Sequence, residues 1–233
     1  MTTVALDHIR QKFGNAGNAA ETAYAVLREA IVTNALAPGT RLRADDLAKQ
    51  LGVSKTPVRE ALRKLQAEEL IAAQPGSGLS VKILSEKELF DIYYIREALE
   101  GMAARLAAEN CSQIELSDLR HMLAEVEAAH ADGRIDALRA LTGKFQLAVF
   151  RAARNERLYR LLKHLQEHMR QLSTGTLTVS GRADEVVAHC RALVAAIAAR
   201  DANEAERLAR DNRRRTLELR LRLCATMPRY RLG

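Results

Sequence analysis

Leu51-Gly52-Val53-Ser54-Lys55-Thr56-Pro57-Val58-Arg59-Glu60-Ala61-Leu62 is the stretch that decides the fold of the amino-terminal part of the chain. A short apolar helix from Asp46 to Leu51 runs into Gly52, which can adopt the left-handed conformation that ends a helix. Ser54 can cap the next helix, and Pro57 lies in its first turn, where a missing N–H does no harm. Two helices joined by so tight a turn predict a helix-turn-helix.

The second helix of this motif has two faces. Its apolar side chains fall at helical spacing and should be buried: Val58, Ala61, Leu62 and Leu65. On another face the cations Lys55, Arg59 and Arg63 repeat every four residues, with Thr56 beside them. A cationic face that begins at a helix N-terminus suits the major groove of DNA. Taken alone, the same pattern also fits an amphipathic helix with a solvated basic face.

The composition permits a nucleic-acid partner without requiring one. The chain has 233 residues and a net charge of +7, but residues 20–83 carry nine Lys and Arg against seven Asp and Glu. The DNA argument therefore rests on the pattern within residues 54–66 rather than on bulk charge. A hydrophobic content of 48% with only 4% aromatic residues predicts a core of Ala, Leu and Val, which favours helices.

The cysteines and the first residues bear on the compartment. Cys111, Cys190 and Cys224 form no CxxC pair and are expected to be reduced, small apolar residues of a cytosolic protein. No apolar run reaches the ~18 residues of a transmembrane helix, and the start of the chain lacks the apolar core of a signal peptide. We expect a soluble, cytoplasmic protein in which residues 1–19 form a mobile arm.

Residues 20–83 are predicted to form a winged helix-turn-helix. A first helix should run from about Glu21 to Asn34, followed by a short, possibly extended piece at 40–42. The helix-turn-helix itself occupies about 45–68. After it, two short extended runs, 70–74 and 79–83, flank the turn Pro75-Gly76-Ser77-Gly78 and predict a β-hairpin. Three helices followed by a hairpin is the order of a winged helix, although a generic surface hairpin would have the same pattern.

Residues 85–227 are predicted to form a second, all-α domain. Capping-box patterns begin at Ser85 and Ser112, and helices are expected at about 85–109, 112–131, 135–153, after Asn155, 183–199 and after Asp201. A loop or interruption is expected at 173–181, and residues 228–233 should be a tail. The predicted fold is mainly α: a winged helix-turn-helix followed by an antiparallel bundle of about six helices.

Both predicted domains resemble known families. The first resembles the GntR family of bacterial transcription regulators, through Leu47-Ala48, Leu51–Leu62, Leu65, Leu70 and the Gly76/Gly78 wing. The second resembles the helical effector domain of that family's FadR subgroup, the FCD domain. The residues that carry this second likeness are Tyr94–Glu100, Phe145, Ala152-Ala153, Asn155, Leu158, His189, Ala192 and Ile197. The resemblance covers about residues 20 to 225.

The resemblance implies how DNA would be bound. Members of the family generally dimerise on palindromic operators, since two-fold protein symmetry reads two-fold DNA symmetry. Base and phosphate contacts are expected from the recognition helix, the start of the preceding helix and the wing: Arg43, Ser54, Lys55, Thr56, Arg59, Arg63, Gly76, Ser77 and Gly78. One position departs, because Asp45 stands where fatty-acid-responsive members carry an Arg, so their operator sequence is not expected here.

The resemblance also implies an effector site in the bundle. In many relatives an Asp and three His hold a divalent metal, and these positions correspond to Thr142, Gln146, His189 and Asn212. One imidazole with hydroxyl and amide groups is a poor ligand set for a transition metal, so we expect no metal and no cofactor. The four side chains would instead bind an organic effector, or would satisfy one another around a trapped water.

Two further side chains are candidates for the effector site. Arg96 matches an Arg common in the family and could bind an effector carboxylate bidentately, or could pair with Glu100. His168 lies near an apolar stripe and could line the pocket, whereas His164, four residues earlier, is expected to be solvated. The arginines Arg213-Arg214-Arg215, Arg220 and Arg222 are expected on a solvated helix face or across a dimer interface.

Three classes of function fit these observations. The leading one is a dimeric regulator, a repressor that is released from DNA when a small molecule, such as a carboxylate, enters the bundle. The second is an enzyme built on the bundle with an accessory DNA-binding domain, although no catalytic set or phosphate loop is visible. The third is an architectural DNA-binding protein without an effector.

Overall fold

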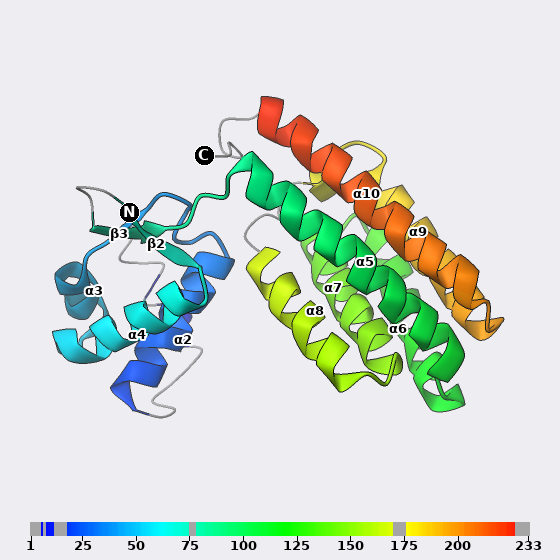
Figure 1. The fold of residues 1–233 in the computed structure, drawn as a ribbon, viewed down its shortest axis with the longest axis horizontal. Helices are drawn as coiled ribbons and strands as arrows, with labels where there is room; N and C mark the ends of the chain where they lie inside the picture. The colour runs from blue at the N-terminus through cyan, green and yellow to red at the C-terminus, as the bar shows by residue number, and fades with distance from the viewer. Residues whose placement is uncertain (1–5, 7, 12–17, 75–77, 170–175, 227–233) are drawn as a thin grey trace. The chain divides into compact units, whose positions relative to one another are not determined.

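The described residues up to 84 form one compact unit, and most of those from 85 to 226 form a second. The structure is a computed structural model, and it describes residues 6, 8–11, 18–74, 78–169 and 176–226. Figure 1 shows the elements of each unit. Each unit is described by itself.

Unit 1 is a winged helix-turn-helix, as the sequence predicts. Its helices are α2 (Ala19–Val32), α3 (Ala44–Leu51) and α4 (Lys55–Ala67), and its strands are β1 (Arg41–Leu42), β2 (Ile71–Gln74) and β3 (Gly78–Val81). The turn between α3 and α4 contains Gly52 with φ +61°, the left-handed conformation expected there.

The wing hairpin is part of a three-stranded antiparallel sheet. β3 is the central strand of the order β1-β3-β2, and it pairs Ala72 with Ser80 on one side. On the other side β1 pairs Arg41 with Ser80 and Leu42 with Leu79. The piece at 40–42 is therefore extended, and it anchors the base of the hairpin to the start of the helix-turn-helix.

One core holds unit 1 together, and it corrects part of the expectation for the amino-terminal arm. Val26 and Leu27 of α2 and Val58 and Leu65 of α4 are fully buried in it. Leu6 and Ile9 are also buried in this core. These two side chains therefore do not belong to a free arm, because their apolar surface is removed from water on folding. The tail at 228–233 lies outside the described residues.

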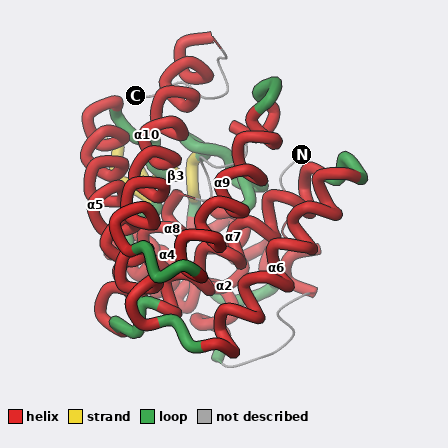
Figure 2. The backbone as a smooth tube through the Cα atoms, turned by 90° about the vertical axis from the view of Figure 1, so that its right-hand side faces the viewer, coloured by secondary structure: helices red, strands yellow, loops and turns green. Residues whose placement is uncertain are grey.

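Unit 2 is a helical bundle with the six predicted helices. They are α5 (Glu86–Asn110), α6 (Gln113–Ala131), α7 (Ile135–Ala152), α8 (Glu156–Met169), α9 (Arg182–Ala198) and α10 (Ala202–Thr226), with a 3₁₀ turn η1 at Thr176–Thr178. Both capping boxes are present: the Ser85 and Ser112 side chains accept from the backbone of Glu88 and Glu115, whose carboxylates accept in return. Figures 1 and 2 show α5 running beside α10.

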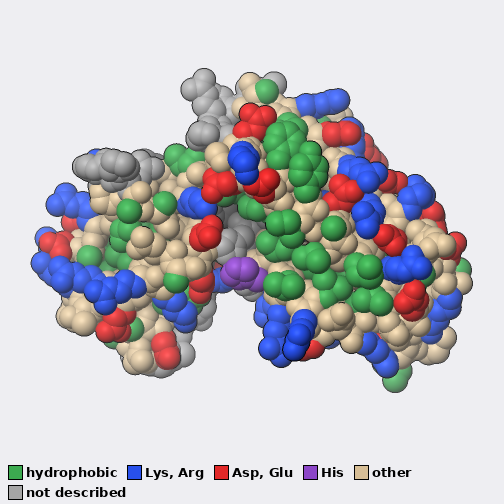
Figure 3. All heavy atoms as spheres, in the orientation of Figure 1, with side chains coloured by type: hydrophobic (Ala, Val, Ile, Leu, Met, Phe, Trp, Pro, Cys, Tyr) green, Lys and Arg blue, Asp and Glu red, His purple; other side chains and the backbone are tan. Residues whose placement is uncertain are grey.

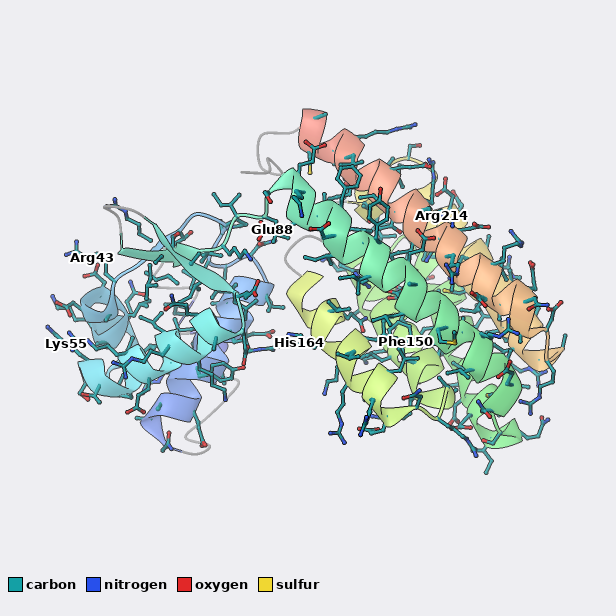
Figure 4. All side chains as sticks on the ribbon, in the orientation of Figure 1. Arg43, Lys55, Glu88, Phe150, His164 and Arg214 are labelled. Atoms are coloured by element: carbon teal, nitrogen blue, oxygen red, sulfur yellow. The ribbon has the colours of Figure 1, made fainter. Side chains whose placement is uncertain are left out.

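The bundle core is built of Ala, Leu and Val with two phenylalanines, as the composition predicts. Phe145 of α7 packs with alanines and valines of α5 and α9, and Phe150, labelled in Figure 4, packs with Leu158 and Leu162 of α8. The three cysteines are free thiols, and burial raises the pKa of Cys190 to about 12. None of the described helices is long and apolar enough to cross a membrane.

Candidate DNA-binding and effector sites

The recognition helix α4 is held by its apolar face, which leaves its cationic face exposed. Val58, Ala61, Leu62 and Leu65 are buried in the core of unit 1, as predicted. Lys55, Thr56, Arg59 and Arg63 are exposed. Figure 3 shows Lys and Arg side chains gathered on the left side of unit 1. The sequence prediction of one buried and one cationic face is confirmed.

Ser54 occupies the N-cap position of α4, but its side chain makes no capping hydrogen bond. The reason lies three residues further on. An N-cap side chain accepts from the backbone N–H of the second or third helical residue, and here the third is Pro57, which has no N–H. The predicted cap is therefore only positional. The exposed hydroxyl of Ser54 remains available to a ligand beside the helix N-terminus, where anions are favoured.

The cations of α4 differ in their surroundings. Arg59 and Arg63 make no hydrogen bond or ion pair with any residue that the structure describes. Lys55, the first residue of α4, has its Nζ 3.0 Å from the Oδ1 of Asp45 in α3. The guanidinium groups of Arg59 and Arg63 are thus available for phosphate or base contacts, whereas the ammonium of Lys55 is already paired with a carboxylate.

The remaining predicted DNA contacts lie before α3 and in the wing. Arg43 is the N-cap residue of α3, is exposed, and has its Nε 3.7 Å from Asp46. Gly78 begins β3 with φ +79° and an exposed backbone that no neighbouring side chain crowds. Gly76 and Ser77 lie outside the described residues.

In unit 2, a buried ion cluster joins α5 to α10. Arg96 donates from Nε to Glu100 Oε1 at 2.8 Å, and Glu100 also accepts from Arg213, whose Nε is 3.0 Å from its Oε2. All three side chains are buried. Burial raises the pKa of Glu100, but Arg213 and Arg96 outweigh it and hold that pKa below its usual value. The pairing of Arg96 with Glu100, one of the two alternatives named for Arg96, is present.

A second buried arginine lies at the start of α9. Arg182 donates to Glu185 at 3.0 Å, to Asn212 Oδ1 at 2.8 Å and to Thr216 Oγ1 at 2.9 Å. Its side chain is buried, and its Nε finds no hydrogen-bond partner among the described residues. Glu185 is shared with Arg215 of α10, at 2.9 Å. We call Arg96, Arg182 and Arg213, together with Glu100, the guanidinium cluster.

His189 is on α9, and the charges of the guanidinium cluster affect its pKa. Burial and the positive charges of Arg213 and Arg182 lower its pKa to about 4, although the carboxylate of Glu100 acts in the opposite direction. The imidazole is therefore neutral at neutral pH. It makes no hydrogen bond with a described residue, which leaves both of its ring nitrogens able to bind a ligand.

The structure brings only part of the predicted effector set together. Asn212 accepts a hydrogen bond from Arg182 of the guanidinium cluster, and the charges of the cluster shift the pKa of His189. The Thr142 hydroxyl donates to the backbone of its own helix, at Leu138 and Arg139. No hydrogen bond among described residues joins Thr142 or Gln146 to the cluster. The side chain of His168 lies outside the described residues, and His164 is exposed as expected.

The residues around His189 do not fit a metal ion. The oxygen of Asn212 already accepts from a guanidinium, and two arginines depress the pKa of the imidazole. A cation placed there would meet the charges of both arginines, whose effect on the imidazole exceeds the opposite effect of the Glu100 carboxylate. In the part of the chain that the structure describes, no three His, Cys, Asp or Glu side chains are grouped so as to hold a metal.

Sequence reasoning missed the arginines of this site. Arg213 and Arg220 were expected on a solvated face or at a dimer interface, but both are buried, and Arg213 binds Glu100 within the chain. Arg214 pairs with Glu97, also within the chain. Arg182 was not singled out at all. Its position gives a signal, because Arg182 is the first residue of α9, a helix whose other buried positions are apolar.

Comparisons with protein families assign both units. Residues 19–81 match the model of the bacterial regulatory proteins of the gntR family. Residues 91–214 match the FCD domain model. The two matches together span unit 1 and the larger part of unit 2.

Individual relatives agree with these assignments. The chain is 34% identical over 145 residues to the HTH-type transcriptional regulator YdhC of Bacillus subtilis, which is 62% of this chain and 65% of the relative. It is 38% identical over 122 residues (52% and 54%) to a protein of Paenarthrobacter nicotinovorans named "Probable D-xylose utilization operon transcriptional repressor". The matched regions thus span less than two thirds of these relatives. Among solved structures, McbR/YncC of Escherichia coli superposes with a TM-score of 0.72 and 26% identity, over 88% of this chain and 99% of that one.

Proposed function

The chain belongs to the GntR family of bacterial regulatory proteins and carries an FCD domain, and from this we infer that it is a DNA-binding transcription regulator under the control of a small-molecule effector. Its curated relatives are named as transcriptional regulators or a repressor. They give the enzyme alternative no support. We propose that it acts as a repressor in the bacterial cytoplasm, where its DNA target lies.

The exposed face of α4 is the observation that carries DNA binding. Arg59 and Arg63 present guanidinium groups that form no ion pair with a described residue, on a helix whose opposite face is fixed in the core. A rigid helix with such a face enters the major groove with its N-terminal residues at the base edges. We assign base contacts to Thr56 and Arg59, and phosphate contacts to Ser54, Arg43 and Arg63, with Gly76–Gly78 of the wing toward the minor groove.

The effector proposed for the bundle is an organic anion, and a carboxylate suits it best. The guanidinium cluster holds three buried arginines and one buried carboxylate, Glu100, and a second carboxylate, Glu185, is shared between Arg182 and Arg215. A buried charge is costly unless it is paired and hydrogen-bonded. A carboxylate would bind a guanidinium bidentately, and the Nε of Arg182 has no hydrogen-bond partner among the described residues. His189 and Asn212 would orient the rest of the molecule, and Thr142, Gln146 and His168 are kept as further candidate contacts.

Effector binding can reach the DNA-binding unit through α5. This helix carries Arg96 and Glu100, and it begins five residues after β3 ends at Val81. An anion that competes with Glu100 for Arg213 would weaken the tie between α5 and α10. Because a ligand shifts an equilibrium only by its unequal affinity for two states, this competition supplies the difference that release from DNA requires.

We propose that the regulator is a homodimer on a palindromic operator. α5 exposes Tyr94, Ile95 and Met102, whose exposed fractions are 60%, 51% and 42%. Phe90 stacks on Tyr94, with ring centroids 5.9 Å apart. Figure 3 shows hydrophobic side chains gathered over α5 and α8 of unit 2. Contiguous exposed apolar surface of this kind is typical of protein interfaces.

Footprinting on the DNA upstream of the protein's own gene tests the proposed function. We expect a protected palindrome, with protection lost in the presence of one member of a carboxylate panel such as acetate, malonate, citrate and gluconate. A protein that protects no site there, or in a genome-wide selection, would contradict the regulator assignment. Protection that no organic anion alters, combined with sensitivity to an uncharged sugar, would contradict the anionic effector.

A further inference from the structure

An acidic side chain lies among the cations of the DNA-binding face. The Oδ1 of Asp45, in the first turn of α3, is 3.0 Å from the Nζ of Lys55, the first residue of α4. About half of each side chain is exposed, 53% for Asp45 and 57% for Lys55. Figure 4 labels Lys55 and Arg43 on the left of unit 1, where α4 and α3 begin. The pair is therefore exposed on the face of unit 1 that we propose binds DNA.

The carboxylate pairs with Lys55 and lies in the electrostatic field of two further cations. The hydrogen bond from Lys55, together with the charges of Lys55, Arg59 and Arg43, holds the pKa of Asp45 below its usual value. Its neighbour Asp46 also lies in the first turn of α3, so the favourable interaction of an acid with that helix N-terminus does not require Asp45. The stability of α3 therefore does not account for the presence of a carboxylate beside Lys55.

Asp45 opposes binding to DNA that offers only phosphates. Attraction between cations and phosphates supplies essentially all non-specific DNA binding. Lys55 has three donors and can contact Asp45 and a phosphate together, but the carboxylate offsets part of its charge and repels the same phosphate. Two unit charges about 4 Å apart in water change a binding constant roughly fivefold. A non-operator duplex provides nothing to offset this loss.

We propose that Asp45 is a specificity-determining residue with two effects. On non-operator DNA it weakens the attraction between Lys55 and the phosphates. On the operator it accepts a hydrogen bond from a base amino group in the major groove. Cytosine N4 and adenine N6 are the amino donors exposed there, and a carboxylate is the usual acceptor for cytosine N4. On the operator that bond offsets the repulsion, so Asp45 lowers non-operator affinity more than operator affinity. This inference rests on the proposed DNA binding and adds a residue that sets its selectivity.

Binding to two duplexes over a range of KCl concentrations tests the proposal. One duplex is the sequence that the wild-type protein selects from a random pool, and the other has the same bases in shuffled order. The proteins are wild type, Asp45→Asn, Lys55→Gln and the double variant. Glu69→Gln is the matched control, because Glu69 forms a carboxylate–lysine pair of the same 3.0 Å length with Lys82 in the same unit.

We expect Asp45→Asn to bind the shuffled duplex about fivefold more tightly and to lose selectivity. Its affinity for that duplex should fall more steeply with salt, by about 0.9 in the slope of log K against log [KCl], because one more phosphate contact forms. In the Lys55→Gln background this change in slope should vanish. Glu69→Gln should stay within twofold of wild type on both duplexes.

Three results would overturn the role of Asp45. They are an unchanged affinity of Asp45→Asn for the shuffled duplex, an equal gain on both duplexes, and the same change in slope with and without Lys55. A wild-type protein that does not distinguish the two duplexes would instead contradict the proposed function itself, so the two failures are separable.

Discussion

Arg182 of α9 donates from Nη2 to the Oδ1 of Asn212 in α10 across 2.8 Å, and the same nitrogen is 2.9 Å from the hydroxyl of Thr216. The amide oxygen of Asn212 is thereby engaged with a positive charge. A site organised in this way attracts anions and disfavours cations. We therefore expect the proposed effector to be bound by guanidinium groups rather than through a metal.

The first prediction concerns Arg182 itself. Arg182→Met should abolish the thermal stabilisation by whichever acid of the panel stabilises the wild type, because the Nε and Nη donors are lost. Arg182→Lys should keep a weaker response, since it retains the charge without the bidentate geometry. Differential scanning fluorimetry with citrate, malonate and gluconate measures this. The control is Arg191→Met, because Arg191 lies on the exposed face of α9, where it pairs with Glu127. This variant should be stabilised like the wild type. Stabilisation of Arg182→Met equal to that of the wild type would contradict the role of Arg182.

The second prediction separates a buried carboxylate from a neighbouring one on the same helix. Glu100→Gln leaves Arg96 and Arg213 buried without a counter-charge and should lower the free energy of unfolding of unit 2 by about 3–5 kcal/mol. Glu97→Gln removes a partner of Arg214, whose side chain is 58% exposed, and should cost less than about 1 kcal/mol. Urea unfolding followed by circular dichroism compares the two. Equal losses would mean that Glu100 is not the charge that compensates the cluster.

Most of the fold could be predicted from the sequence because its signals are local. The capping boxes at Ser85 and Ser112 need only residues three apart, and both are formed. The turn at Gly52 needs a single residue with positive φ. The buried stripe of α4 follows from the helical period. Ser54 shows the limit of such rules. It occupies the N-cap position, but its side chain makes no capping hydrogen bond, because Pro57 has no N–H at the third helical position.

The effector site could be predicted only in part, because burial of a charged residue depends on distant partners. Arg213 meets Glu100 across 113 positions in the sequence, and Arg182 meets Asn212 across 30. Reasoning from composition and helical periodicity predicts that arginines lie on the surface, because most arginines in proteins are exposed. The sequence contained Glu100 as an alternative partner of Arg96, but nothing in it indicated that one carboxylate would serve two arginines.

The third prediction tests whether Arg59 reads bases. Arg59→Ala should weaken binding to the selected operator by about 1–3 kcal/mol and relax the base preference at one position. Lys64→Ala removes the same charge from α4, but Lys64 lies over the ring of Tyr24, 4.0 Å from its centroid, and should change affinity little. Fluorescence anisotropy with the operator and its single-base variants measures both. If Lys64→Ala weakened operator binding as much as Arg59→Ala, net charge rather than a base contact would be responsible.

The fourth prediction concerns the exposed apolar face of α5. Ile95→Glu should convert the dimer to a monomer, because a carboxylate would have to be buried in the interface without a partner. Ile114→Glu is the control, since Ile114 of α6 is even more exposed, at 76%, and lies outside that face. Sedimentation equilibrium distinguishes the two states. A dimer that survives Ile95→Glu would place the interface elsewhere, and a monomeric wild type would contradict the proposed homodimer.

The last prediction uses the depressed pKa of His189. Burial and the charges of Arg213 and Arg182 lower it to about 4, whereas an unfolded histidine titrates near 6.5. Between these values the unfolded state binds the extra proton, so the stability contributed by neutral His189 is fully present above about pH 6.5 and is lost as the pH falls toward 4. The loss should amount to about 3 kcal/mol.

His189→Gln cannot titrate, so its unfolding free energy should fall less steeply than that of the wild type over this window. His121→Gln, at a side chain that is 78% exposed, should follow the wild-type curve. Urea unfolding at half-unit steps of pH provides the comparison. Parallel curves for wild type and His189→Gln would mean that the imidazole is not held neutral by the guanidinium cluster. A bound organic anion should raise the pKa of His189 by offsetting the charge of Arg182, so saturating citrate would flatten the wild-type curve if citrate occupies this site.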